Sequence, residues 1–237
     1  MELTDHFVMA LAAPRKSGKS YFVGAMLRSG MMDHFDHIII LCPTLQYNDD
    51  YQEFEEDVKR YTLISDVNGQ LIEDLFTRQA TCMRKVKARE RRSKHLPKLY
   101  CPSTLLILDD CIDSGVLDFR GTVDKIAERG RHINMSAIMC SQRISAISRS
   151  VRLNSDYFII FSPYSVQELE QFIEQFISKE HRKPLREKLG DIFETPHQFI
   201  VLDNSEKNIR KKLKTSNAQD FIEGKAEVLD IAVKVKK

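Results

Sequence analysis

Five short, almost unbroken runs of apolar residues limit how this chain of 237 residues can fold. They lie at residues 6–13, 36–42, 104–108, 135–140 and 157–161. Strands buried on both faces have such runs, whereas a strand with one wet face alternates apolar and polar residues. The segments between the runs are long enough for crossover helices. The sequence therefore predicts an α/β fold with a mainly parallel central sheet flanked by helices.

Two segments carry a clear helical pattern. Residues 166–177 place apolar side chains on one stripe, and Ser165 followed by Glu168 forms a capping box at the start. A longer helix is predicted from residue 70 into the region of residue 94, with apolar residues on one side as far as Val86. Beyond Val86 the segment is highly charged and has little apolar surface to bury, so we expect it to project into solvent.

The C-terminal part of the chain follows a different pattern. An apolar run at residues 197–202, a turn at 203–205 and a segment at 208–214 predict antiparallel strands at the edge of the sheet. Residues 215–237 have weak periodicity, which favours a mobile C-terminal tail. Because no linker interrupts residues 1–214, we expect a single domain there.

The composition excludes several classes of protein. Hydrophobic residues make up 42% of the chain and charged residues 30%, which is typical of a globular protein and not of a disordered or collagen-like one. The net charge of +2 is too small to indicate a nucleic-acid partner. Any surface that binds nucleic acid must therefore be a local cluster of basic residues. The five cysteines include no C-x-x-C pair, which argues against a disulfide framework or a zinc site. We expect no membrane span and no signal peptide, and thus a reducing, aqueous compartment.

A phosphate-binding loop is predicted directly after the first apolar run. The segment reads Ala13-Pro14-Arg15-Lys16-Ser17-Gly18-Lys19-Ser20, which is the P-loop pattern G-x-x-x-x-G-K-[ST] with alanine at its first position. A strand before the loop and a helix after it are the context that this motif requires. The alternative is a chance Gly-Lys-Ser sequence at a helix start. The residues predicted to bind the nucleotide are Pro14, Arg15, Lys16, Ser17, Gly18, Lys19, Ser20 and Tyr21.

The same motif predicts the ligands that these residues hold. Lys19 should reach the β- and γ-phosphates of ATP, and the Ser20 hydroxyl should bind Mg²⁺.

Asp109 and Asp110 follow the third apolar run, so we expect them just beyond the carboxyl edge of the sheet, where such folds bind ligands. Asp109 is predicted to hold Mg²⁺, directly or through water, and Asp110 to orient or deprotonate the attacking water. The alternative is that either acid only caps the following helix.

Further polar residues surround the fourth apolar run. Gln142 stands where that strand should end, so its amide can bridge the γ-phosphate and the attacking water. Arg131 precedes the strand and is predicted to enter the site of a neighbouring subunit as an arginine finger. The alternative makes Gln142 a strand-end amide and Arg129, Arg131 and Arg143 surface cations.

With these motifs in place, the sequence resembles the genome-packaging ATPases of poxviruses, other large DNA viruses and virophages, within the FtsK/HerA superfamily. The resemblance rests on residues 13–20 and 106–110 and on Ala127-Glu128-Arg129-Gly130-Arg131-His132 running into Ser141-Gln142-Arg143. Such motors usually carry Asp-Glu where this chain has Asp109-Asp110. The resemblance implies a ring-forming ATPase, a pentamer or hexamer, that moves double-stranded DNA into a preformed capsid. It also implies a capsid or portal-vertex protein as partner, and a location at the assembly site in the host cytoplasm and in the virion.

A basic cluster in the charged half of the long predicted helix is the candidate contact with DNA. It comprises Arg84, Lys85, Lys87, Arg89, Arg91 and Arg92. In a ring channel these side chains would neutralise phosphates without reading bases, whereas a solvated helix face explains the same residues without DNA. A nucleotide-dependent switch or scaffold in virion assembly is the alternative function, and a small-molecule kinase is a third. ATPase activity that rises with protein concentration and with duplex DNA would distinguish the motor from the switch.

Overall fold

The computed structural model describes residues 3–92, 97–111, 120–162, 165–205, 212–229, 231 and 233. These residues form one nine-stranded sheet in the order β3-β2-β4-β5-β1-β6-β7-β8-β9. The parallel part consists of β3 (Tyr61–Ile64), β2 (His37–Leu41), β4 (Thr104–Leu108), β5 (Met135–Ser141), β1 (Val8–Ala12) and β6 (Tyr157–Phe161). The antiparallel part consists of β7 (Phe199–Asp203), β8 (Lys212–Ser216) and β9 (Glu227–Leu229).

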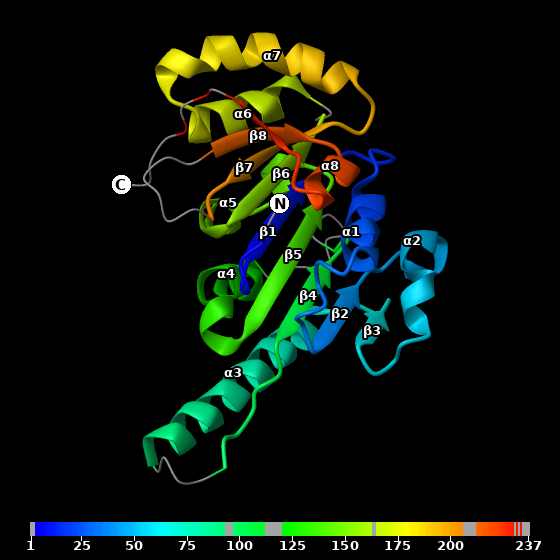
Figure 1. Ribbon diagram of the computed structural model, residues 1–237, viewed down its shortest axis with the longest axis vertical. Coiled ribbons are helices and arrows are strands. Elements are labelled where there is room, and N and C mark those ends of the chain that lie inside the picture. The colour runs from blue at the N-terminus through cyan, green and yellow to red at the C-terminus, as the bar shows by residue number, and fades with distance from the viewer. Residues whose placement is uncertain are drawn as a thin grey trace.

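Helices cover both faces of the sheet (Figure 1). One face carries α1 (Lys19–Arg28), α2 (Asp49–Gln52) and α8 (Ala218–Ile222). The other carries α3 (Gly69–Arg92), α4 (Arg120–Arg129), α5 (Arg149–Asn154), α6 (Val166–Phe176) and α7 (Arg182–Glu194). The central strands β1, β4, β5 and β6 are buried at every position, because alternate side chains pack into the two apolar clusters. The predicted α/β fold with antiparallel C-terminal edge strands is confirmed.

The predicted elements lie close to the observed ones. All five apolar runs form parallel strands, and the predicted C-terminal hairpin is the β7–β8 pair. Helix α6 begins as predicted, since the Ser165 side chain accepts a hydrogen bond from the Glu168 backbone N–H at 3.3 Å. The predicted tail begins inside β8, and α8 and β9 follow. Because Phe221 of α8 is fully buried, this part of the tail packs onto the sheet.

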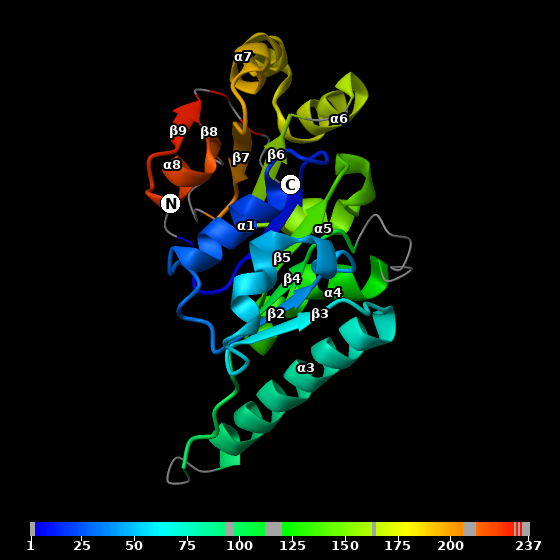
Figure 2. The ribbon, with the colours of Figure 1, turned by 90° about the vertical axis from the view of Figure 1, so that its right-hand side faces the viewer.

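Helix α3 extends well past the edge of the sheet (Figure 2). Its 24 residues span about 36 Å at 1.5 Å per residue. Apolar residues of its first half pack against the core, with Ile72 fully buried, whereas the charged second half projects from the body of the protein. No helix in the described ranges is both long and apolar enough to span a membrane.

Candidate active site

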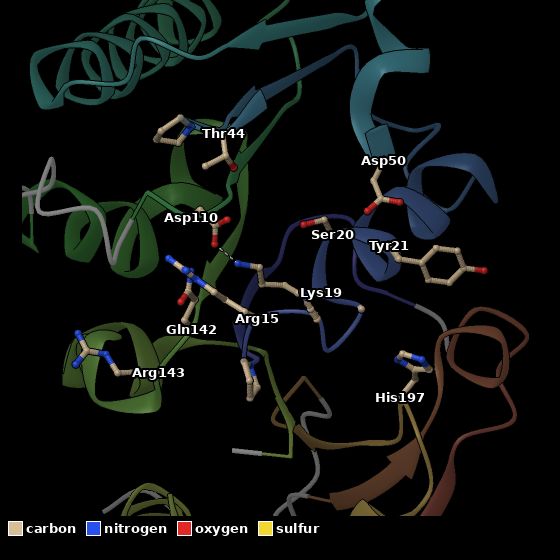
Figure 3. Close-up of a pocket in the computed structure, with 14 residues that line it drawn as sticks. Arg15, Lys19, Ser20, Tyr21, Thr44, Asp50, Asp110, Gln142, Arg143 and His197 are labelled. Carbon is tan, nitrogen blue, oxygen red and sulfur yellow. Dashed lines mark hydrogen bonds and ion pairs between the residues drawn. The ribbon is translucent and has the colours of Figure 1, made fainter. Parts of the chain in front are cut away.

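The loop of residues 13–18 joins β1 to α1 at the carboxyl edge of the parallel strands (Figure 3). Gly18 is the N-cap of α1 and has φ 92° and ψ 19°, in the left-handed region that glycine adopts at little cost. The Ser17 hydroxyl donates to the Pro14 carbonyl at 2.7 Å, which closes the loop on itself. The backbone N–H groups at the start of α1 therefore face the same space as the loop, an arrangement suited to an anion.

Lys19 lies between the two carboxylates that follow β4. Its Nζ is 3.0 Å from Asp109 Oδ1 and also donates a hydrogen bond to Asp110 Oδ1. The Lys19 side chain is almost fully buried. Burial alone would lower the pKa of Lys19, but the charges of Asp109 and Asp110 outweigh that effect and raise it above its ordinary value. Lys19 therefore stays a cation at any physiological pH.

Asp109 is fully buried and is held mainly by hydroxyl groups. Its Oδ2 accepts hydrogen bonds from the Ser20 hydroxyl at 2.8 Å and from the Tyr51 phenol at 2.9 Å. Its Oδ1 pairs with Lys19 but accepts no hydrogen bond from any residue that the structure describes. Burial, together with the negative charge of Asp109, holds the pKa of Tyr51 well above its ordinary value, so the phenol remains a donor.

These oxygens fit the ligand chemistry of Mg²⁺. A magnesium ion prefers carboxylate and hydroxyl oxygens and keeps several of its waters. Asp109 Oδ1 is a buried carboxylate oxygen that accepts no hydrogen bond within the described part of the chain, and the Ser20 hydroxyl lies beside the same carboxylate. The residues present are therefore suited to the cation that the sequence predicted at Ser20 and Asp109.

A cavity of about 930 Å³ opens above the loop. Gln142, directly after β5, lines it together with Asp110, and Figure 3 shows both on the side toward which Lys19 points. Asp110 has φ 55°, which is uncommon for a residue other than glycine and turns the chain at the end of β4. The lining consists of Pro14, Arg15, Lys16, Gly18, Lys19, Ser20, Tyr21, Pro43, Thr44, Asp50, Asp110, Gln142, Arg143 and His197.

Several residues of the site were missed by the sequence analysis. Thr44 lies just beyond β2, so the rule that ligands bind past the ends of parallel strands would have found it. Asp50 and Tyr51 belong to the four-residue helix α2, and His197 lies in the turn before β7. Neither segment carries a motif that points to phosphate, and both reach the loop only through the tertiary fold.

Arg131 does not join the site of its own chain. It lies in the short helix η3 (Gly130–Ile133), immediately before the amino end of β5. The phosphate loop follows the carboxyl end of β1, which runs parallel to β5. The five residues of β1 span about 16 Å, so Arg131 lies at the opposite edge of the sheet. This position excludes a role at the phosphate loop of its own chain, and both interpretations from the sequence analysis remain open: a finger in a neighbouring subunit or a surface cation.

The predicted basic cluster lies on the projecting half of α3. Arg84, Lys85, Lys87, Arg91 and Arg92 are exposed, and Arg89 is half-buried. Arg89 donates to the Pro97 carbonyl at 2.9 Å and Lys87 to the His132 carbonyl at 3.1 Å. The cluster is thus a cationic surface, part of which is tied to neighbouring backbone.

Comparisons with known proteins identify the family and the fold. A family model described as Poxvirus A32 protein matches residues 2–216. No curated protein matches the chain. Among solved structures, the genome packaging NTPase B204 from Sulfolobus turreted icosahedral virus 2, in complex with ATP-gammaS, is similar at 19% identity with a TM-score of 0.58, covering 91% of this chain and 98% of that one.

A second solved structure extends the likeness beyond viruses. The cytoplasmic domain of the type VII secretion ATPase EccC from Thermomonospora curvata is similar at 15% identity with a TM-score of 0.60, covering 89% of this chain and 25% of that one. At these identities the structural matches establish the fold. Together with the family match they confirm the P-loop ATPase fold and the resemblance drawn from the motifs.

Proposed function

Since the chain belongs to the Poxvirus A32 protein family, we propose that it hydrolyses ATP to move double-stranded viral DNA into a preformed capsid. The observation that carries this proposal is the convergence of Lys19, Ser20, Asp109 and Asp110 at the end of the sheet. Such a set combines a cation that can bind phosphate, oxygens that can bind a metal ion, and a second carboxylate that is available as a proton acceptor. B204, described as the DNA-packaging ATPase of Sulfolobus turreted icosahedral virus, supports the same assignment through its fold.

The triphosphate would bind at the amino end of α1. Backbone N–H groups of residues 15–21 would donate to its oxygens, and the positive end of the helix would favour its charge. Lys19 would exchange its two carboxylate partners for the β- and γ-phosphate oxygens. Asp109 and Ser20 would hold Mg²⁺, which when bound withdraws charge from the phosphate oxygens.

Hydrolysis requires a proton acceptor beside the γ-phosphate. Asp110 lines the cavity and contacts Lys19, which supports the proposal that its carboxylate takes the proton of an attacking water once Lys19 binds phosphate. Gln142 lines the same end, and its amide can orient that water by donating to it and accepting from it. Arg131 of an adjacent subunit would supply the remaining positive charge, a contribution worth about 10³–10⁵-fold in known cases.

The remaining features concern assembly and DNA. A finger supplied between subunits implies a homo-oligomeric ring, and we propose a pentamer or hexamer. The basic cluster on α3 would grip phosphates without reading sequence, because lysine and arginine side chains neutralise backbone charge. A capsid or portal-vertex protein would anchor the ring at the assembly site in the host cytoplasm and in the virion.

The test is the ATPase rate of the full chain against protein concentration, with and without linear duplex DNA. We expect a rate that rises cooperatively with concentration, increases with DNA and is abolished in Lys19→Ala. The Arg131→Ala variant should still bind ATP, and it should lower the ATPase rate of rings in which it is mixed with wild-type subunits. Slow turnover that ignores both DNA and concentration would refute the motor and favour the nucleotide-dependent switch.

A further inference from the structure

The cavity above the phosphate loop is larger than the phosphate chemistry requires. Its volume of about 930 Å³ lies near the top of the range of about 300–1,000 Å³ that is typical of small-molecule sites. Lys19, Asp110 and Gln142 lie toward one end, whereas Tyr21 and His197 lie on the other side of the loop (Figure 3). The second end carries two aromatic rings, and no role has yet been given to either side chain.

The direction of the triphosphate follows from the chemistry of the first end. The γ-phosphate must lie near the carboxylate and amide that act on the attacking water, namely Asp110 and Gln142. The α-phosphate is joined to the nucleoside and is therefore the phosphate farthest from these residues. The nucleoside must accordingly leave the loop on the side of Tyr21 and His197.

The imidazole ring of His197 packs against the phosphate loop. It has φ 62°, in the left-handed region that residues other than glycine seldom adopt. Its Nδ1 lies 3.1 Å from the Ser17 carbonyl oxygen. A Cβ atom placed on Gly18 would lie 3.2 Å from the same nitrogen, so the imidazole ring packs directly on the loop. The residue is nevertheless exposed, which leaves ring surface open at the cavity.

The Tyr21 ring is held in place by a contact with Arg28. The Arg28 guanidinium carbon lies 5.7 Å from the centre of the Tyr21 ring, a cation–π contact, and Arg28 is itself paired with Glu53 at 2.5 Å. Tyr21 is 57% exposed, although a tyrosine ring has a large apolar surface. An aromatic ring that is held in place and still exposed in a cavity is suited to stacking with a flat ligand.

We propose that Tyr21 and His197 form the binding site for the aromatic base of the nucleotide. This inference rests on the proposed function, since it assigns the nucleoside end of the same substrate. The base stacks on the two rings while the triphosphate lies along the loop. Stacking of a base on one aromatic side chain changes affinity by about tenfold or more.

The experiment compares the dissociation constants of ATP and inorganic tripolyphosphate, which lacks a base, by calorimetry on the full chain. The variants are His197→Asn, Tyr21→Ala and Tyr21→Phe, and asparagine is chosen because it tolerates the left-handed conformation of residue 197. Tyr47→Ala is the matched control, since Tyr47 is 81% exposed and does not line the cavity. The ratio of the two constants within one variant cancels any fraction of misfolded protein.

We expect ATP to bind wild type more tightly than tripolyphosphate. That preference should fall about tenfold in His197→Asn and in Tyr21→Ala, return in Tyr21→Phe and persist in Tyr47→Ala. Parallel loss of both ligands in His197→Asn would mean that the ring only supports the loop, and would overturn the base site. Equal affinity of wild type for the two ligands would also overturn it while leaving the phosphate site intact. Binding of neither ligand to wild type would refute the proposed function itself.

Discussion

Tyr51→Phe removes one oxygen atom from the candidate site and leaves the aromatic ring in place. The Tyr51 phenol is fully buried and donates to Asp109 Oδ2 at 2.9 Å. The Ser20 hydroxyl donates to the same oxygen at 2.8 Å, and Lys19 pairs with the other one at 3.0 Å. The substitution therefore takes from Asp109 one of the two hydroxyl donors described for it, and it creates no cavity larger than the lost oxygen.

The size of the effect follows from the charge of the acceptor. A hydrogen bond to a charged group contributes about 1.5–3 kcal/mol, about twice the value for a neutral pair. Because Ser20 and Lys19 remain in contact with Asp109, we expect a loss of about 1.5 kcal/mol in the free energy of unfolding, at the lower end of that range. A less well-held metal ligand should also raise the Mg²⁺ concentration needed for half-maximal ATPase rate by about tenfold.

The assay pairs urea unfolding with a Mg²⁺ titration of the ATPase rate. Tyr157→Phe is the matched control, because Tyr157 is also fully buried and hydrogen-bonded but does not line the cavity. We expect the control to lose stability and to keep the wild-type Mg²⁺ midpoint. If Tyr51→Phe loses stability with no change in that midpoint, the phenol only fills the core and the positioning argument fails.

Three further predictions address the loop, its acidic neighbour and the basic cluster. Gly18→Ala should destabilise the fold by about 1 kcal/mol or more and weaken ATP binding, because φ is 92° and the new Cβ meets His197, as thermal unfolding and calorimetry would show. Burial raises the pKa of Asp50 above its ordinary value of 3.8, so the folded state binds the carboxyl proton more tightly than the unfolded state. The free energy of unfolding therefore falls as pH rises from 3.8 through the higher pKa of the folded state. Asp50→Asn should therefore be more stable than wild type at pH 7 in urea unfolding, with the gain lost below pH 3.8. The double variant Arg91→Ala, Arg92→Ala should weaken duplex binding and reduce the slope of log affinity against log salt by about 2.

The sequence predicted the central sheet because burial on both faces leaves a local signal. Each of the five predicted strands is an almost unbroken apolar run, and each lies among the parallel strands. Strand β3 (Tyr61–Ile64) was missed because it has only four residues at the edge of the sheet, with Thr62 exposed. An edge strand with one wet side has no apolar run to detect.

The same reasoning separates the predictable from the unpredictable parts of the site. Lys19, Ser20, Asp109 and Asp110 follow directly from strand ends and a loop motif, which are properties of the local sequence. Tyr51 is fully buried, yet its neighbours in the chain are acidic or polar, so no hydrophobic pattern marks it as a core residue. Its burial results from packing of α2 over the carboxylate at the end of β4, a contact between segments far apart in the sequence.

Strand β5 gives the proposed ring a rigid link between two nucleotide sites. Its seven residues are all buried and span about 23 Å, with Gln142 after the carboxyl end and η3 before the amino end. A Cβ atom on Gly130 would lie 2.7 Å from the Met135 carbonyl oxygen, so η3 packs closely on β5. This packing holds the backbone of Arg131 in place. Lys87 of α3 binds the His132 carbonyl at 3.1 Å and ties the basic helix to the same element. If Arg131 completes the neighbouring site, hydrolysis in that site changes the contacts of Arg131. Because η3, β5 and α3 are linked, we expect the subunit to move as one rigid body together with its candidate DNA contact.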